Sequence, residues 1–196
     1  MVVKELSIAF AGRGGQGIVF AATTLATALY RMGAYVAQLQ SYGAEVRGGS
    51  VLAYVVLSKD RIENPFPEAF DIVVALHDAG VARRASSIRA SKLILYEGEL
   101  VKSLKDLSNA VPVPLVEDVM RRVGKEVVNA AALGVLAGLI PELRDGLRDV
   151  LKSGKGGDVN VAAFDIGVEK ARSLNIPEGL KGVIEEVRNL LASLGK

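Results

Sequence analysis

A glycine-rich loop at residues 12–17 restricts the possible folds of this chain more than any other feature of its sequence. The loop reads Gly12, Arg13, Gly14, Gly15, Gln16 and Gly17, and it joins a short apolar run at residues 6–11 to a helical pattern at residues 18–32. A Gly-x-Gly-x-x-Gly turn in this context is typical of α/β nucleotide-binding folds. The glycines let the backbone approach a pyrophosphate, and the following helix directs unpaired N–H groups at the anion. Arg13 offers an additional charge-assisted contact.

The residues around this loop narrow the kind of ligand. NAD-binding domains place Asp or Glu about 20 residues further on, at the end of the second strand, whereas residues 37–40 read Ala-Gln-Leu-Gln. No Lys-Ser or Lys-Thr follows Gly17, so the loop is not a Walker A motif. We therefore expect a nucleotide-bearing ligand that needs no such acid. A tight strand–helix turn without a ligand is the alternative.

Alternating strand and helix patterns extend this interpretation along the chain. The patterns predict further strands at residues 34–40, 51–57, 70–76, 92–96 and 111–116, with the last at a sheet edge because two prolines interrupt it. From residue 117 onward they predict mainly helices, including an apolar one at residues 127–140 and a last one at residues 183–194, with a polar glycine loop at residues 153–158. The expected architecture is a Rossmann-like α/β fold: a mostly parallel sheet, helices on both faces and a helical C-terminal part, in one domain spanning residues 1–196.

Composition excludes several classes of site and partner. The formal charge of +2 supplies no electrostatic argument for a nucleic-acid partner, and the chain has no cysteine for disulfides, iron–sulfur clusters or thiolate zinc sites. The longest nearly apolar run, residues 127–140, is shorter than the ~20 residues that span a bilayer. With no secretory signal pattern at residues 1–10, we expect a cytoplasmic protein without a membrane partner.

A second glycine-rich loop follows the second predicted strand. It contains Ser41, Tyr42, Gly43 and, further on, Arg47 before Gly48 and Gly49. Because the carboxyl ends of parallel strands share one edge of a sheet, both glycine loops should face the same crevice. Arg47 is suited to hold an anionic group; a surface ion pair with Glu45 is the alternative.

Together the two loops resemble the gamma subunit of 2-oxoacid:ferredoxin oxidoreductases. The likeness rests on Gly-x-Gly-Gly-Gln-Gly after the first strand and Tyr-Gly-x-Glu-x-Arg-Gly-Gly after the second. It continues in an Asn-x-x-x-Leu-Gly helix at residues 129–134 and an Asn-x-x-Ala-Phe-x-x-Gly helix at residues 160–167. The four motifs occur in the family's order and cover most of the chain.

The resemblance implies an enzyme that oxidatively decarboxylates a 2-oxoacid, reduces ferredoxin and forms an acyl-CoA, with this chain as a subunit that is not catalytic alone. Coenzyme A would bind at this subunit, and thiamine diphosphate, magnesium and iron–sulfur clusters would lie on partner subunits. The partners implied are alpha and beta subunits, optionally a ferredoxin-like delta subunit, and ferredoxin through the complex. The form of residues 40–45 slightly favours 2-oxoglutarate over pyruvate. The implied cofactor-binding residues are Gly12, Arg13, Gly14, Gly15, Gln16, Gly17, Ser41, Tyr42, Gly43, Arg47 and Asn129.

Four polar residues outside the loops also need an assignment. His77 follows a predicted strand and is interpreted as a loop residue, with a functional role as the alternative. Asp71 is interpreted as a loop residue and Asp78 as a helix cap. Asn129, within an apolar helix, must find buried hydrogen-bond partners, either in the backbone or in the ligand.

Two other functions remain as alternatives to the enzyme subunit: an independent nucleotide-binding oxidoreductase and a regulatory nucleotide-binding module.

Overall fold

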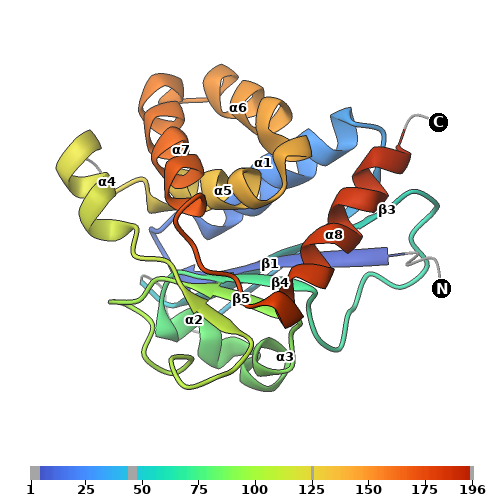
Figure 1. Cartoon of the computed structure of the whole chain (residues 1–196), viewed down its shortest axis with the longest axis horizontal. Helices are drawn as coiled ribbons and strands as arrows, with labels where there is room; N and C mark the ends of the chain where they lie inside the picture. The colour runs from blue at the N-terminus through green and yellow to red at the C-terminus, as the bar shows by residue number, and fades with distance from the viewer. Residues whose placement is uncertain (1–4, 44–47, 125, 195–196) are drawn as a thin grey trace.

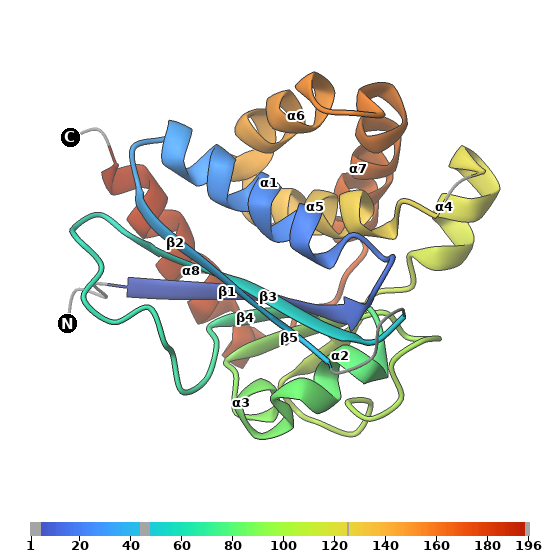
Figure 2. The ribbon, with the colours of Figure 1, turned by 180° about the vertical axis from the view of Figure 1, so that it is seen from behind.

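A six-stranded sheet forms the centre of the molecule. The computed structural model describes residues 5–43, 48–124 and 126–194, and the sheet has the strand order β2-β3-β1-β4-β5-β6 (Figures 1 and 2). The strands are β1 (Glu5–Arg13), β2 (Tyr35–Tyr42), β3 (Ser50–Ser58), β4 (Ile72–Ala75), β5 (Leu93–Tyr96) and β6 (Ala110–Pro112). β6 lies at one edge, as its prolines predicted, and β2 lies at the other.

One strand runs against the other five. β1, β4, β5 and β6 pair in parallel, whereas β3 is antiparallel to both of its neighbours, β1 and β2. The mostly parallel sheet is therefore confirmed. The sequence predicts no helix between residues 41 and 49, and the short segment that joins β2 to β3 leaves no room for the crossover that a parallel pair requires, so β3 runs antiparallel to β2.

Helices cover both faces of the sheet, as expected. One face carries α1 (Ile18–Arg31), α5 (Val128–Leu139), α6 (Arg144–Ser153), α7 (Gly157–Ala171) and α8 (Glu178–Ser193); the other carries α2 (Asp78–Arg83) and α3 (Ala85–Arg89) (Figure 1). In β1, Ile8 and Phe10 pack into the core on the α1 and α5 face, and Ala9 and Ala11 pack into the core on the α2 and α3 face. This burial on both faces explains why β1 reads as a continuous apolar run rather than an alternating one.

The helical C-terminal part packs as a layer around α5. α4 (Val116–Val123) precedes α5, and a short 3-10 turn (Pro141–Leu143) joins α5 to α6. All but two residues of α5 are buried, because α1, α6 and α7 all contact it, which explains its apolar sequence. α8 begins at Glu178, five residues before the predicted start, because its first turns contain Gly179 and Gly182, which weaken the helical pattern. Among the helices of the described residues, none is both long and apolar enough to cross a membrane.

Candidate functional site

The first glycine loop forms a tight connection from β1 to α1. Gly15 and Gly17 have φ angles of 97° and 70°, a region that favours glycine, and Gly17 is the residue that caps α1. The side chain of Gln16 folds back into the loop. Its Oε1 accepts a hydrogen bond from the Arg13 N–H at 2.8 Å, and its Nε2 donates to the Leu76 carbonyl at 3.4 Å. Gln16 therefore shapes the loop rather than reaching out of it.

The two glycine loops meet at one edge of the sheet. The N–H of Gly14 donates to the carbonyl of Gly49 at 2.8 Å, and a Cβ on Gly14 would lie 3.3 Å from the backbone nitrogen of Gly48. The expectation that both loops face one crevice is confirmed, although for a different geometrical reason. β2 is not a neighbour of β1; the antiparallel β3 begins at this edge and lies between them.

A groove of about 300 Å³ lies beside the first loop, over the start of α1. The first turn of α1 contains no acidic residue, so the positive end of the helix dipole is not offset there. Arg13 is the charged residue that lines the groove, and Phe20 and Tyr42 supply exposed aromatic surface. The other lining residues are Gly14, Gly15, Gly17, Ile18, Val19 and Val51. The groove thus combines close backbone access, one cation and an apolar wall.

Ser41 and Tyr42 were both predicted to contact the ligand, but their side chains lie on opposite faces of the sheet. Tyr42 lines the groove on the α1 side of the sheet. Ser41, its neighbour in an extended strand, faces the opposite side and accepts a hydrogen bond from Nη2 of Arg83 in α2 at 2.8 Å. Gly43 pairs with the start of β3, donating its N–H to the Ser50 carbonyl at 2.8 Å. Arg47 and Glu45 lie outside the described residues, so Arg47 stays a prediction.

Asn129 joins the helical layer to the glycine loop. It lies in the first turn of α5, is 8% exposed, and its Nδ2 donates to the carbonyl of Gly17 at 3.4 Å. A Cβ on Gly17 would lie 2.8 Å from Cγ of Asn129. The asparagine thus contacts the residue that caps α1, which is a backbone partner of the kind that a buried amide requires.

The remaining family motifs form a helix–helix contact. A Cβ on Gly134 of α5 would lie 2.8 Å from the carbonyl carbon of Phe164 in α7, and a Cβ on Gly167 of α7 would lie 2.8 Å from the carbonyl carbon of Ala131 in α5. Asn160 holds the turn before α7, because its Nδ2 donates to the carbonyl of Lys155 at 3.1 Å. These motif residues determine how closely α5 and α7 approach each other.

Sequence reasoning missed Gly80, although α2 depends on it. A Cβ on Gly80 would lie 2.7 Å from Cα of Gly12, so α2 rests directly on the backbone at the end of β1. The available signal was the small pair Ala79-Gly80, four residues after the end of an apolar strand. Because Gly80 has no side chain, α2 packs directly against the backbone of Gly12, where the glycine loop begins.

The polar residues between β4 and α2 have structural roles. His77 caps α2, since its Nδ1 accepts a hydrogen bond from the Ala79 N–H at 3.1 Å. Asp78 is therefore not the cap itself. Its carboxylate accepts hydrogen bonds from the N–H groups of Lys102 and Ser103, at 2.9 and 3.1 Å. Burial raises the pKa of Asp78, but the hydrogen bonds from Ser103 and Lys102, with His77 nearby, outweigh it and lower the pKa below its ordinary value.

Asp71, expected to be a simple loop residue, belongs to a hydrogen-bond and ion-pair network that connects β1 to α8. It accepts hydrogen bonds from the backbone N–H and the hydroxyl of Ser7 at 2.7 and 3.0 Å. It also pairs with Lys92 at 2.9 Å, and Lys92 pairs in turn with Glu186 of α8 at 2.7 Å. This network lies at the amino ends of the parallel strands, away from the groove.

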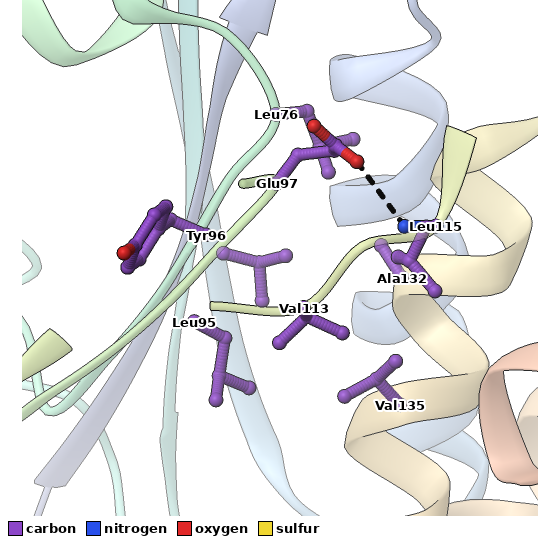
Figure 3. Close-up of a pocket in the computed structure, with 9 residues that line it drawn as sticks. Leu76, Leu95, Tyr96, Glu97, Val113, Leu115, Ala132 and Val135 are labelled. Carbon is purple, nitrogen blue, oxygen red and sulfur yellow. Dashed lines mark hydrogen bonds between the residues drawn. The ribbon is translucent and has the colours of Figure 1, made fainter. Parts of the chain in front are cut away.

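A buried carboxylate, Glu97, was also missed by sequence reasoning. It follows β5 and is 1% exposed. Its Oε2 accepts from the N–H groups of Glu99 and Leu100 at 2.7 and 3.0 Å, and its Oε1 accepts from Leu115 at 3.2 Å (Figure 3). A cavity of about 10 Å³ lies next to it, lined otherwise mainly by apolar side chains of β4, β5 and α5. Glu97 therefore positions the loop after β5 and the start of α4.

No group of three or more His, Cys, Asp or Glu residues is arranged to hold a metal ion in the part of the chain that the structure describes. The groove beside the glycine loop is the candidate site because Arg13, the backbone of the first glycine loop and the start of α1 meet there.

Comparison with known proteins identifies the family. The sequence profile of the pyruvate ferredoxin/flavodoxin oxidoreductase family matches residues 7–170. The chain is 32% identical over 186 residues to 2-oxoglutarate synthase subunit KorC of Archaeoglobus fulgidus, covering 93% of this chain and 96% of that protein. It is 30% identical over 177 residues to ketoisovalerate oxidoreductase subunit VorA of Methanothermobacter marburgensis, covering 86% of this chain but 37% of that protein.

Solved structures show the same fold. The gamma subunit of a keto/oxoacid ferredoxin oxidoreductase from Geobacter sulfurreducens superposes with a TM-score of 0.71 at 26% identity, covering 86% of this chain and 99% of that one. The 2-oxoglutarate:ferredoxin oxidoreductase of Magnetococcus marinus, solved with 2-oxoglutarate, coenzyme A and succinyl-CoA bound, superposes with a TM-score of 0.75 at 24% identity, covering 88% of this chain and 32% of that one. The chain therefore belongs to the pyruvate ferredoxin/flavodoxin oxidoreductase family, as a gamma-type subunit of a 2-oxoacid:ferredoxin oxidoreductase.

Proposed function

We propose that this subunit contributes to coenzyme A binding through the groove beside its glycine loop, within an enzyme that converts 2-oxoglutarate to an acyl-CoA. On this proposal residues 1–196 act as one gamma-type domain of a cytoplasmic hetero-oligomer. Alpha and beta subunits, and where present a ferredoxin-like delta subunit, carry thiamine diphosphate, magnesium and the iron–sulfur clusters, and deliver electrons to ferredoxin. A chain without cysteine supplies no thiolate to a cluster.

The observation that carries the proposal is the meeting of three binding elements in one groove. Gly15 leaves its backbone open, since a Cβ there would meet nothing within 4 Å. Arg13 lines the same groove as the start of α1, so charge and helix dipole both favour a phosphate. Phe20 and Tyr42 offer aromatic surface on which a planar base can stack. Coenzyme A combines a pyrophosphate with an adenine, and this set of residues suits both.

The sheet topology argues against NAD as the ligand. In dinucleotide-binding domains, the acid that holds the ribose lies at the end of a parallel strand next to β1. Here the antiparallel β3 occupies that position, and β2 ends in Gln40, Ser41 and Tyr42 without a carboxylate. Coenzyme A does not require this acid.

The preference for 2-oxoglutarate draws support from the relatives. KorC subunits of 2-oxoglutarate synthases match over most of their length, at 32% identity in Archaeoglobus fulgidus and 31% in Methanocaldococcus jannaschii. Pyruvate synthase subunit PorC of Methanothermobacter marburgensis matches at 28% and indolepyruvate oxidoreductase subunit IorB of Pyrococcus horikoshii at 25%. Between 2-oxoglutarate, pyruvate and indolepyruvate this order agrees with the preference drawn from residues 40–45; VorA subunits of ketoisovalerate oxidoreductases match at 30% and 29%.

Two glycine substitutions test the site. Gly15 and Gly33 have φ angles of 97° and 92°, and a Cβ on either would meet nothing within 4 Å. Gly15→Ala and Gly33→Ala therefore impose a similar backbone strain of about 1–2 kcal/mol, but only the first places a methyl group in the groove. We expect Gly15→Ala to weaken coenzyme A binding by about tenfold or more and Gly33→Ala to leave it unchanged.

Calorimetric titration of the assembled complex measures the affinity of each variant for coenzyme A and, separately, its affinity for NADH. Equal affinity for coenzyme A in the two variants would remove the groove from the binding site. Tight binding of NADH would favour an independent nucleotide-binding oxidoreductase instead.

A further inference from the structure

We propose that the free edge of β2 pairs with β2 of a second copy of this chain, which joins the two sheets into one across a twofold axis. The proposal does not depend on coenzyme A binding. It rests on the hydrogen-bonding groups along this edge and on the self-complementarity of the strand.

The outer edge of β2 presents a regular row of backbone groups. Within the described residues β2 pairs only with β3, and Figure 2 shows it running along the near edge of the sheet with no element in front of it. The N–H of Gly43 bonds to Ser50 of β3. Because bonding alternates along an antiparallel ladder, the odd-numbered residues of β2 bond to β3 and the even-numbered ones direct their N–H and C=O outward. The outward residues are Val36, Gln38, Gln40 and Tyr42.

This edge carries none of the features that usually prevent pairing between sheets. β2 is eight residues long and contains no charged residue, proline or glycine. β6, at the opposite edge, is three residues long and ends at Pro112, with Pro114 close behind. Proteins usually protect long exposed edges with lysine, proline or a bulge. The contrast between the edges indicates that β2 is covered by another extended strand.

The sequence of β2 is complementary to itself in one register. If Leu39 lies opposite Leu39 of the second copy, Gln38 faces Gln40, Ala37 faces Ser41, and Val36 faces Tyr42. Tyr35, which is 54% exposed, then faces Gly43, a pairing in which an aromatic ring covers a glycine. Apolar residues meet apolar or small ones, amides meet amides, and no like charges meet. This match favours a second copy over a strand of a different subunit.

The register also agrees with the hydrogen-bonding pattern. Leu39 is odd-numbered, so it would form a pair without direct hydrogen bonds, flanked by bonded pairs of outward residues. The second copy would border the groove, because its Val36 lies opposite Tyr42, a groove residue. The two candidate sites of a dimer would then lie at opposite ends of the shared strand pair.

Single cysteine substitutions test both the contact and its register. The chain has no cysteine, so Leu39→Cys introduces a unique thiol. In the proposed register its partner thiol lies directly across the axis, with Cα atoms about 4.5 Å apart, within the range that a disulfide spans. Gln40→Cys is the matched control: residue 40 of one copy lies opposite residue 38 of the other, so the two residue-40 Cα atoms are roughly 8–9 Å apart, beyond the range of a disulfide.

We expect the oxidised, purified full-length Leu39→Cys chain to run as a disulfide-linked dimer on a non-reducing gel, and Gln40→Cys to remain unlinked. Absence of a link at residue 39, or equal linking at both positions, would overturn the proposal.

A mass measurement by light scattering gives an independent check. Gln40→Pro removes an outward N–H and leaves the pairing with β3 intact, so it should weaken the dimer by about tenfold or more, whereas Gln40→Ala should not. A monomeric wild-type chain, or a dimer insensitive to Gln40→Pro, would also refute the pairing.

Discussion

The side-chain amide of Asn129 lies against Gly17, the residue that caps α1, and donates a hydrogen bond to its carbonyl at 3.4 Å. This contact joins the helical C-terminal part of the chain to the glycine loop, across 112 residues of sequence. It explains why an asparagine is found at the start of an otherwise apolar helix.

A double-mutant cycle on this pair tests the contact. Gly17→Ala introduces a Cβ that overlaps the amide of Asn129, in addition to strain at a φ of 70°. Asn129→Ala removes the amide and therefore the overlap. We expect the double variant to lose less free energy of unfolding than the sum of the single variants, by about 1 kcal/mol or more, measured by urea denaturation. Additive losses would show that the two residues do not interact.

The crossing of α5 and α7 predicts opposite effects for two glycine-to-alanine changes. A Cβ on Gly167 would lie 2.8 Å from the carbonyl carbon of Ala131 and 2.9 Å from the backbone nitrogen of Val135, whereas a Cβ on Gly182 of α8 would meet nothing within 4 Å. Gly167→Ala should therefore cost about 1–3 kcal/mol or more of stability, because α7 must move away from α5. Gly182→Ala should add about 1 kcal/mol, because alanine favours the helix.

Thermal and urea unfolding of both variants check this prediction. A neutral Gly167→Ala would mean that the two helices are not held in close contact by their glycines.

The opposite orientations of Ser41 and Tyr42 predict unequal effects on coenzyme A binding. Tyr42 lines the groove, whereas Ser41 faces α2 and bonds to Arg83. Tyr42→Ala should reduce the affinity of the assembled complex for coenzyme A by about 1–3 kcal/mol if the ring stacks on the base. Ser41→Ala should leave the affinity unchanged. The same titration applied to both variants decides the question, and a larger effect at Ser41 would place the ligand on the α2 side of the sheet.

The ion pairs of Asp118 predict a pH-dependent contribution to stability. Its carboxylate contacts Lys170 of α7 and Arg121, each at 2.6 Å, and the hydrogen bond from Lys170, with both charges, lowers the pKa of Asp118. A lowered folded-state pKa gives stability above the unfolded value of about 3.9 that disappears as the pH falls through the folded value. Asp118→Asn should therefore cost up to about 1 kcal/mol at pH 7, the scale of a solvent-accessible pair.

At low pH, below both pKa values, wild type and Asp118→Asn should be almost equally stable. Salt provides the control, since screening should reduce the difference at pH 7. A difference that is the same at pH 3 and pH 7 would assign the effect to packing rather than charge.

Local sequence patterns predicted much of the fold because each reports a local physical requirement. The apolar run of β1 predicted burial on both faces, the glycines of residues 12–17 predicted a tight strand–helix connection, and Pro112 and Pro114 predicted an edge strand. The apolar helix at residues 127–140 was predicted within one residue at each end and is observed at Val128–Leu139. Each of these signals depends on neighbours in sequence.

The sequence by itself thus determined the mostly parallel α/β architecture, the glycine loop and, through four motifs, the family. Only the tertiary structure decided that β3 runs antiparallel between β1 and β2 and that Ser41 and Tyr42 face opposite sides. It also decided that Gly80 and Asn129 pack against the glycine loop, and that Glu97 positions the loop after β5. Strand order and helix contacts depend on which distant surfaces bury the most apolar area and satisfy each other's hydrogen bonds. Periodicity along the chain contains no information on that choice, because it is made between segments separated by many residues.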